Sequence, residues 1–284
     1  MRAKLLLDSR AQLGEGPIWH PKEQALYWVD IEGCQVHRYC PETHTDKSVR
    51  LPERVGAVVP RRNGQLVVAL QNSIAALDFE SGELVETLCP FEADQPGVRA
   101  NDGKCDPQGR FWIGSMDLKC RQGAGAFYCL DTDGKLDLKL DDVSISNGLA
   151  WTADHQTLFY IDSPTGKVDA FDFDVDRGDI SNRRTAFEIP EGAGSPDGMA
   201  IDVNGNLWIA MFFGSAVLCF DPATGEVLER VELDVPFVTA CAFGGEKLDT
   251  LFITTATSED APTSGGLFVA KPNVCGSPTF SFNG

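Results

Sequence analysis

Short apolar segments recur along the whole chain, and polar turns separate them. Runs of four to seven residues rich in Val, Ile, Phe, Tyr and Trp alternate with NG, DG, GG or TG pairs. Strands joined by tight hairpins have this pattern. The 3.6-residue apolar periodicity of an amphipathic helix is absent. The pattern therefore predicts an all-β protein.

The apolar segments belong to a longer repeated unit. Each copy has a polar turn, a short strand, a second turn, a strand ending in Trp, Phe or Tyr, and a third strand. The copies begin about 40 to 50 residues apart, which is the period of four-stranded propeller blades. They begin at Gly14, Val55, Asn101, Ser146, Ser195 and Val238. Six copies predict six blades.

A blade on its own exposes an apolar face and an open sheet edge, and both are covered only when the ring closes. We therefore predict a six-bladed β-propeller that residues 1–284 form as one domain. The N-terminal segment KLLLDSR is expected to pair with the last blade. Regularly spaced strands also fit a β-sandwich or two β domains, which remain the alternative folds.

Composition excludes several classes of partner. The chain has 284 residues, of which 43% are hydrophobic and 23% charged, so it can bury a large core. Its net charge of −18 opposes binding to a phosphate backbone or to an anionic membrane surface. We expect neither nucleic acid nor membrane as a partner.

The cysteines indicate a reducing environment. Their number, nine, is odd, and no CxxC pair occurs, so neither a disulfide framework nor a zinc knuckle is predicted. Cys105, Cys129, Cys219 and Cys241 lie in apolar runs and are expected to be buried. No segment resembles a signal peptide or approaches the ~18 apolar residues that span a bilayer. A cytoplasmic protein is the expectation.

Oxygen-bearing side chains recur where the first strand of a copy begins. Glu15 lies in GEGP, Asn101 and Asp102 in RANDG, Asn147 in SNGL, and Asp197 in SPDG. In a propeller these strand starts face the central channel, so such side chains can surround one divalent cation. Asn-Gly and Asp-Gly pairs are also common in turns, which is the alternative interpretation. Recurrence at equivalent places favours the metal site.

The same segments carry a family resemblance. GEGPIW, RANDG followed by GRFWIGSM, SNGLAW, and SPDGMAID followed by GNLWIA occur in one order over nearly the whole chain. Together they resemble the SMP-30/gluconolactonase family, which includes regucalcin and sugar lactonases. The resemblance implies a six-bladed propeller that holds one divalent ion through Glu15, Asn147 and Asp197. The ion could be Ca²⁺, Zn²⁺, Mn²⁺, Mg²⁺ or Fe²⁺.

The resemblance also implies where a substrate binds. Arg99 and Asn101 match the substrate-contacting residues of the family, and Asp102 would support the metal site without binding the metal. A further acidic substrate contact of regucalcin-like members has no clear counterpart here, since the segment reads GSMDLKCRQGAG. Counting places Lys119 there, and Asp117 is the alternative. A basic residue at this point would suit a substrate with an anionic substituent.

We therefore expect a metal-dependent hydrolase that opens a small sugar lactone to the aldonic acid, a step of carbohydrate metabolism. Asp197 would bind the metal and act as general base. No GxSxG segment suggests a serine nucleophile. Three alternatives remain: a regucalcin-like calcium-binding protein, a paraoxonase-like esterase or lactonase of non-sugar substrates, and a scaffold propeller. A monomer or weak homodimer is expected; the sugar, the ring size and the metal stay open.

Overall fold

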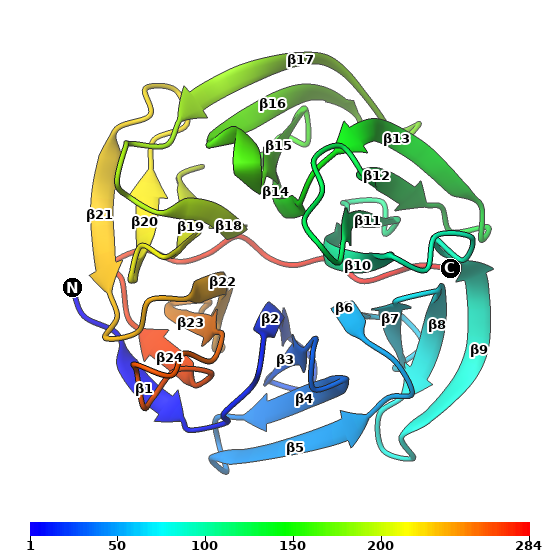
Figure 1. The fold of residues 1–284 in the computed structure, drawn as a ribbon, viewed down its shortest axis with the longest axis horizontal. Coiled ribbons are helices and arrows are strands. Elements are labelled where there is room, and N and C mark those ends of the chain that lie inside the picture. Colours follow the sequence, from blue (N-terminus) through cyan, green and yellow to red (C-terminus); the bar gives the residue numbers. More distant parts are fainter.

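Six four-stranded antiparallel sheets surround a central channel in the computed structural model, which describes residues 1–284 (Figure 1). The predicted six-bladed β-propeller is confirmed. The only helical element is a short 3-10 helix, η1, spanning Ser163–Thr165. No helix has the length and apolar character needed to cross a bilayer.

The first three blades follow one another directly along the chain. Blade 1 contains β2 (Gly14–His20), β3 (Ala25–Asp30), β4 (Gln35–Cys40) and β5 (Thr45–Arg50). Blade 2 contains β6 (Val55–Pro60), β7 (Leu66–Leu70), β8 (Ser73–Asp78) and β9 (Glu83–Pro90). Blade 3 contains β10 (Val98–Cys105), β11 (Phe111–Asp117), β12 (Gly125–Leu130) and β13 (Leu136–Val143).

The last three blades follow the same plan, except that the outermost strand of the sixth blade comes from the N-terminal end of the chain. Blade 4 contains β14 (Ser146–Trp151), β15 (Thr157–Asp162), β16 (Lys167–Asp174) and β17 (Asp179–Glu188). Blade 5 contains β18 (Ser195–Ile201), β19 (Leu207–Phe212), β20 (Ala216–Phe220) and β21 (Val227–Glu232). Blade 6 contains β22 (Val238–Gly244), β23 (Thr250–Thr255), β24 (Leu267–Ala270) and, outermost, β1 (Lys4–Leu7).

The ring is closed by the two ends of the chain. β1 pairs with β24, with Lys4 opposite Val269 and Leu5 opposite Phe268. The predicted pairing of the N-terminal segment with the last blade is therefore confirmed. The six innermost strands contact their neighbours around the channel, including β22 against β2. Closure leaves no blade with an uncovered apolar face.

Burial decreases from the channel outward. β3, β7 and β11 are buried along their whole length, whereas the outermost strands β5, β9 and β17 are largely exposed. The core lies mainly between blades, where Trp19 of blade 1 stacks on Phe252 of blade 6 with ring centroids 5.8 Å apart. Cys105, Cys129, Cys219 and Cys241 are buried as predicted. All nine cysteines are free thiols.

In two blades a buried aspartate holds the Trp side chain of the second strand. Asp106 accepts hydrogen bonds from the backbone N–H groups of Gln108 and Arg110 at 2.9 and 3.0 Å and from the indole N–H of Trp112 at 2.9 Å. Asp202 accepts the equivalent bond from Trp208 at 3.1 Å. One carboxylate thus fixes both the hairpin turn and the ring that packs beside it.

The C-terminal tail, residues 271–284, crosses the end of the propeller where the innermost strands finish (Figure 1). The backbone N–H of Ser277 donates to the oxygen of Ile201 at 3.0 Å. Thr279 donates to the oxygen of Trp19 at 3.0 Å, and Phe282 donates to that of Pro60 at 2.8 Å. The tail therefore ties blade 5 to blades 1 and 2.

Candidate metal centre and substrate site

All six innermost strands have a register irregularity near their start. In β2 it falls between Glu15 and Ile18, and in β18 between Pro196 and Met199. β6, β10, β14 and β22 are irregular at the matching position. A bulge turns side chains out of the regular alternation of a strand. The predicted polar residues lie within or beside these irregular segments, at one end of the channel.

The Gly residues that follow these polar residues lie inside strands, so the turn interpretation of the motifs is wrong. Gly148 is in β14 and Gly198 is in β18. A Cβ atom on Gly148 would be 2.6 Å from the backbone oxygen of Asp197 in the next blade. Glycine is needed there because neighbouring innermost strands approach closely at the hub.

Replacing Gly148 with alanine is expected to lower the free energy of unfolding by about 1–3 kcal/mol, since an overpacked contact against backbone cannot relax by a side-chain rotation. Urea denaturation followed by circular dichroism measures this change. Gly97→Ala is the matched control, because its Cβ would meet only Asp117, at an ordinary 3.6 Å. Equal stability of the two variants would contradict the close approach of the strands.

The predicted polar residues converge at the hub. Glu15, Asn147 and Asp197 are each no more than 7% exposed. Burial, followed by repulsion from Asp102, raises the pKa of Glu15 to about 8. Burial, followed by the charges of Glu15 and Asp102, raises the pKa of Asp197 well above its usual range, while Asn147 and Arg99 act in the opposite direction. Three carboxyl groups thus repel one another in a site shielded from water.

The oxygen atoms at this site fit a divalent cation. Oδ1 of Asn147 and Oδ1 of Asp197 are both buried without a hydrogen-bond partner. Unpaired buried acceptors are costly, and a cation would relieve both them and the carboxylate repulsion. No three His, Cys, Asp or Glu side chains form a metal-ligating group. The predicted set contains only two such residues, since Asn147 contributes a carboxamide.

Arg99 and Asn101 form a buried network beside the carboxylates. Nη1 of Arg99 donates to the backbone oxygen of Ala100 at 2.9 Å and to Oδ1 of Asn101 at 2.6 Å. Nδ2 of Asn101 donates to the backbone oxygen of Ser146 at 2.7 Å. Asn101 therefore links blade 3 to the segment that carries Asn147. Both side chains are held in place by hydrogen bonds before any substrate binds.

Asp117 and Lys119 occupy different environments on the loop after β11. The carboxylate of Asp117 pairs with Arg121 at 2.7 Å and accepts the backbone N–H of Lys119 at 2.8 Å. The bond from Arg121 lowers the pKa of Asp117 to about 2. Asp117 is thus already engaged within its own loop, whereas the Lys119 side chain is exposed. Arg121 is paired with Asp117 rather than free for a substrate anion.

Three residues that support the site were not singled out from the sequence. Asp30 accepts the backbone N–H groups of Gln12 and Leu13, both at 3.0 Å, in the segment leading to Glu15. Asp162 does the same for Ser144 and Ile145, at 3.1 and 2.8 Å, ahead of Asn147. Ser163 accepts a 3.1 Å hydrogen bond from Nδ2 of Asn147. The recurrence of Asp at the end of second strands (YWVD, LFYID) was the available signal.

Comparison with known proteins decides the family. Residues 13–257 match the family described as SMP-30/Gluconolactonase/LRE-like region. The chain belongs to the SMP-30/gluconolactonase family. Within this family, regucalcin from Xenopus laevis is 39% identical over 280 residues, covering 94% of this chain and 93% of regucalcin. A Bacillus subtilis protein named "Putative sugar lactone lactonase YvrE" is 36% identical over 291 residues, covering 100% and 99%.

Solved structures of SMP-30/gluconolactonase relatives superpose on this chain along its length. A luciferin-regenerating enzyme has a TM-score of 0.93 at 32% identity, with 99% of each chain covered. A calcium-binding protein, regucalcin from Agrobacterium tumefaciens, has a TM-score of 0.93 at 25% identity, covering 99% of this chain and 97% of the other. The resemblance predicted from the four motifs is confirmed.

Proposed function

We propose that this protein hydrolyses a sugar lactone with the help of one divalent cation held by Glu15, Asn147 and Asp197. The observation that carries the proposal is the pair of buried, unpartnered oxygens on Asn147 and Asp197 within a cluster of mutually repelling carboxyl groups. The similarity to the Bacillus subtilis sugar lactone lactonase supports the reaction class. Lactone hydrolysis at a metal centre needs such an oxygen-rich, water-shielded site.

Asp197 acts as the general base in this proposal. Its carboxylate takes a proton from the attacking water, whose oxygen bonds to the lactone carbonyl carbon. The ring C–O bond then breaks, and the proton passes from Asp197 to the departing ring oxygen, which becomes a hydroxyl group. When bound, a divalent cation supplies Lewis-acid stabilisation of the negative charge that develops on the carbonyl oxygen.

Arg99 and Asn101 position the substrate. Both are buried beside the carboxylates and held by hydrogen bonds to each other and to blade 4. A preorganised guanidinium and carboxamide can orient the hydroxyl groups of a sugar without a further loss of side-chain entropy. Asp102 supports the site electrostatically, because its charge raises the pKa of both Glu15 and Asp197. This polar surround favours a sugar over an aliphatic, paraoxonase-type substrate.

A lactone panel tests the proposal. Gluconolactone, xylonolactone, arabinonolactone and galactonolactone are offered to purified protein with Ca²⁺, Zn²⁺, Mn²⁺, Mg²⁺ or Fe²⁺, and acid release is followed with a pH indicator. We expect at least one lactone to be opened well above its spontaneous rate with at least one ion. Spontaneous rates throughout would defeat the proposal.

A calcium-binding role is the second candidate, because the similarity to regucalcins covers nearly the whole chain. The same oxygen atoms of Glu15, Asn147 and Asp197 would hold the ion in that case. The lactone panel separates the two functions: a protein that only binds Ca²⁺ shows calcium binding by calorimetry but no acid release with any ion.

Lys119→Ala is expected to lower kcat/KM about three- to tenfold for lactones with an anionic substituent, and to leave neutral lactones unchanged. Arg121 pairs with Asp117, so Lys119 is the cation of this loop that can contact a substrate anion. The expected effect is modest because an exposed charge adds little to substrate binding. Lys47→Ala, on the outermost strand of blade 1, is the matched control. An equal effect on neutral and anionic lactones would remove Lys119 from the substrate site.

We also propose that the protein is cytoplasmic. All nine cysteines are free, and Cys120 is exposed as a thiol. Exposed free thiols persist in a reducing compartment. Thiol titration of protein from freshly lysed cells, before and after reduction, checks this: a fully reduced population is expected.

A further inference from the structure

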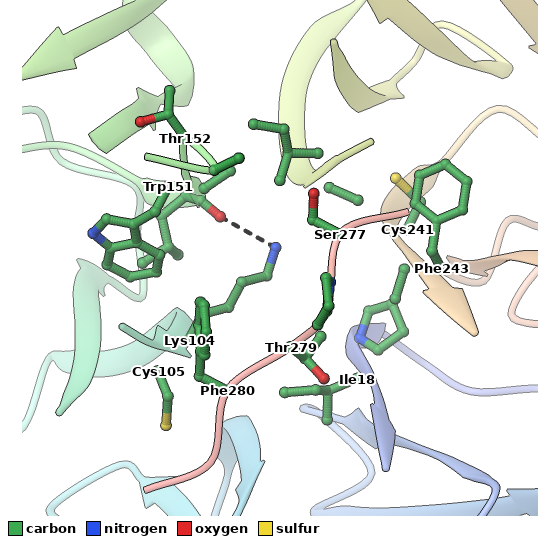
Figure 2. Close-up of a pocket in the computed structure, with 18 of the residues that line it drawn as sticks. Ile18, Lys104, Cys105, Trp151, Thr152, Cys241, Phe243, Ser277, Thr279 and Phe280 are labelled. Carbon is green, nitrogen blue, oxygen red and sulfur yellow. Dashed lines mark hydrogen bonds between the residues drawn. The ribbon is translucent and has the colours of Figure 1, made fainter. Parts of the chain in front are cut away.

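A cavity lies at the opposite end of the channel from the candidate metal centre. Its volume is about 270 Å³, and it is enclosed by the last residues of the innermost strands and by the C-terminal tail (Figure 2). Ile18, Trp151 and Phe243 line it from three blades, and Thr279 and Phe280 line it from the tail. The lining is mostly apolar, as in sites that bind small organic molecules.

Lys104 brings one positive charge into this apolar cavity. Figure 2 shows Lys104 reaching across the cavity, where its Nζ donates to the backbone oxygen of Leu149 at 3.2 Å and to that of Met199. An ammonium group has three N–H donors, so one remains for a ligand. Lys135, Lys139 and Lys167 form salt bridges with aspartates, whereas Lys104 forms none. The acid whose pKa the charge of Lys104 acts to lower is Asp102, which lines the narrow space next to the cavity and not the cavity itself. No Asp or Glu lines the cavity.

A constriction separates this cavity from the candidate metal centre. The space between them is only about 10 Å³ and is lined by residues that include Gly16, Asp102 and Lys104. That is about the volume required by a single water molecule. A sugar lactone at the metal centre could not extend through it. The cavity is therefore a separate compartment rather than part of the substrate site.

We propose that this cavity binds a compact apolar monocarboxylate, with the carboxylate on Nζ of Lys104 and the apolar body against Ile18, Trp151 and Phe243. A cation with a free donor, no salt bridge and no acid in the surrounding cavity wall selects an anion, and a charge-assisted hydrogen bond at a partly dry site is strong. The apolar walls favour a hydrocarbon body over a hydrated ion such as phosphate. This inference does not depend on the proposed lactonase activity.

Isothermal titration with phenylacetate and its neutral analogue phenylacetamide tests the proposal. A chelator is present throughout, so that a carboxylate cannot bind a cation at the other end of the channel. We expect one phenylacetate per chain, bound at least tenfold more tightly than phenylacetamide. Equal affinity of the acid and the amide, or no binding of either, would overturn the proposal.

Variants locate the bound acid. Lys104→Met is expected to remove the preference for phenylacetate over phenylacetamide, and Lys47→Met, on an outer strand, is expected to keep it. Ala150→Leu places a larger side chain at a position that lines the cavity and should abolish binding of both compounds while Lys104 is intact. Circular dichroism verifies folding; if Lys104→Met does not fold, Ala150→Leu decides. Undiminished binding to Ala150→Leu, or a retained acid preference in Lys104→Met, would place the ligand elsewhere.

Discussion

Asp197→Asn is expected to reduce lactone hydrolysis by at least about a thousandfold while the propeller stays folded. General-base catalysis contributes about 10²–10⁴ to a rate, and the substitution also removes a carboxylate from the proposed cation site. The thermal stability of the metal-free protein, in contrast, is expected not to decrease. Burial, followed by the charges of two neighbouring carboxyl groups, raises the pKa of Asp197, so the metal-free variant should unfold at the same or a higher temperature than the wild type.

The opposite directions of the two effects separate a catalytic role from a structural one. Steady-state kinetics with the lactone opened fastest by the wild type measures the first effect, and thermal unfolding in chelator measures the second. Asp234→Asn is the control, because Asp234 is exposed and pairs only with Arg2 on the surface. Retention of more than a tenth of the activity would exclude Asp197 as the base, and a large loss of stability would indicate a structural role instead.

Removing divalent cations is expected to abolish catalysed hydrolysis and to make stability fall as pH rises from about 5 to 8. The pKa of Glu15 is raised from 4.5 to about 8 in the folded, metal-free protein. Between these values the folded state keeps a proton that the unfolded state has lost, so the free energy of unfolding decreases with pH. Adding back the cation should reverse the loss most at pH 8, because binding requires deprotonated carboxylates.

Thermal unfolding in chelator and with an excess of the activating ion, at pH 5 and pH 8, checks this. An ion at a hundred times its Kd contributes about 2.7 kcal/mol, which corresponds to an increase in Tm of about 5 to 10 °C. Glu15→Gln isolates the contribution of Glu15, since the other titrating groups remain. If the variant and the wild type lose stability equally with pH in chelator, Glu15 does not hold the proton.

The fold could be predicted because strands, turns and the repeat spacing can each be recognised from short segments of the sequence. Each strand shows an apolar run and each hairpin its polar turn, and the spacing of the six copies determines the number of blades. The ring closure could also be predicted, because a blade is stable only when the ring is complete, and KLLLDSR pairs with the last blade as expected. The position of Glu15, Asn147 and Asp197 at one end of the channel follows from the same repeat, because equivalent residues of successive blades face a common axis.

Local patterns did not reveal how the site is held together. NG and DG pairs are typical of turns, yet the pairs at the channel lie in strands where the backbones of adjacent blades approach closely, as at Gly148 and Asp197. The bond between Asn101 and Ser146 spans 45 residues, and Arg121 pairs with Asp117 only because their loop folds back. No periodicity records such contacts, since the first arises from the packing of one blade against the next and the second from the path of a single loop.

The sequence by itself determined six β blades, their closure, and the set of oxygen-bearing side chains at the hub, because these depend on residue type at a repeated spacing. Only the tertiary structure decided which of those oxygens lack a partner and that Lys104 enters an apolar cavity without a salt bridge. It also showed that the tail crosses from blade 5 to blades 1 and 2, with Thr279 bonded to Trp19 across 260 residues. The physical reason is that burial and hydrogen-bond satisfaction are properties of the whole packed chain, whereas strand and turn preferences belong to short segments.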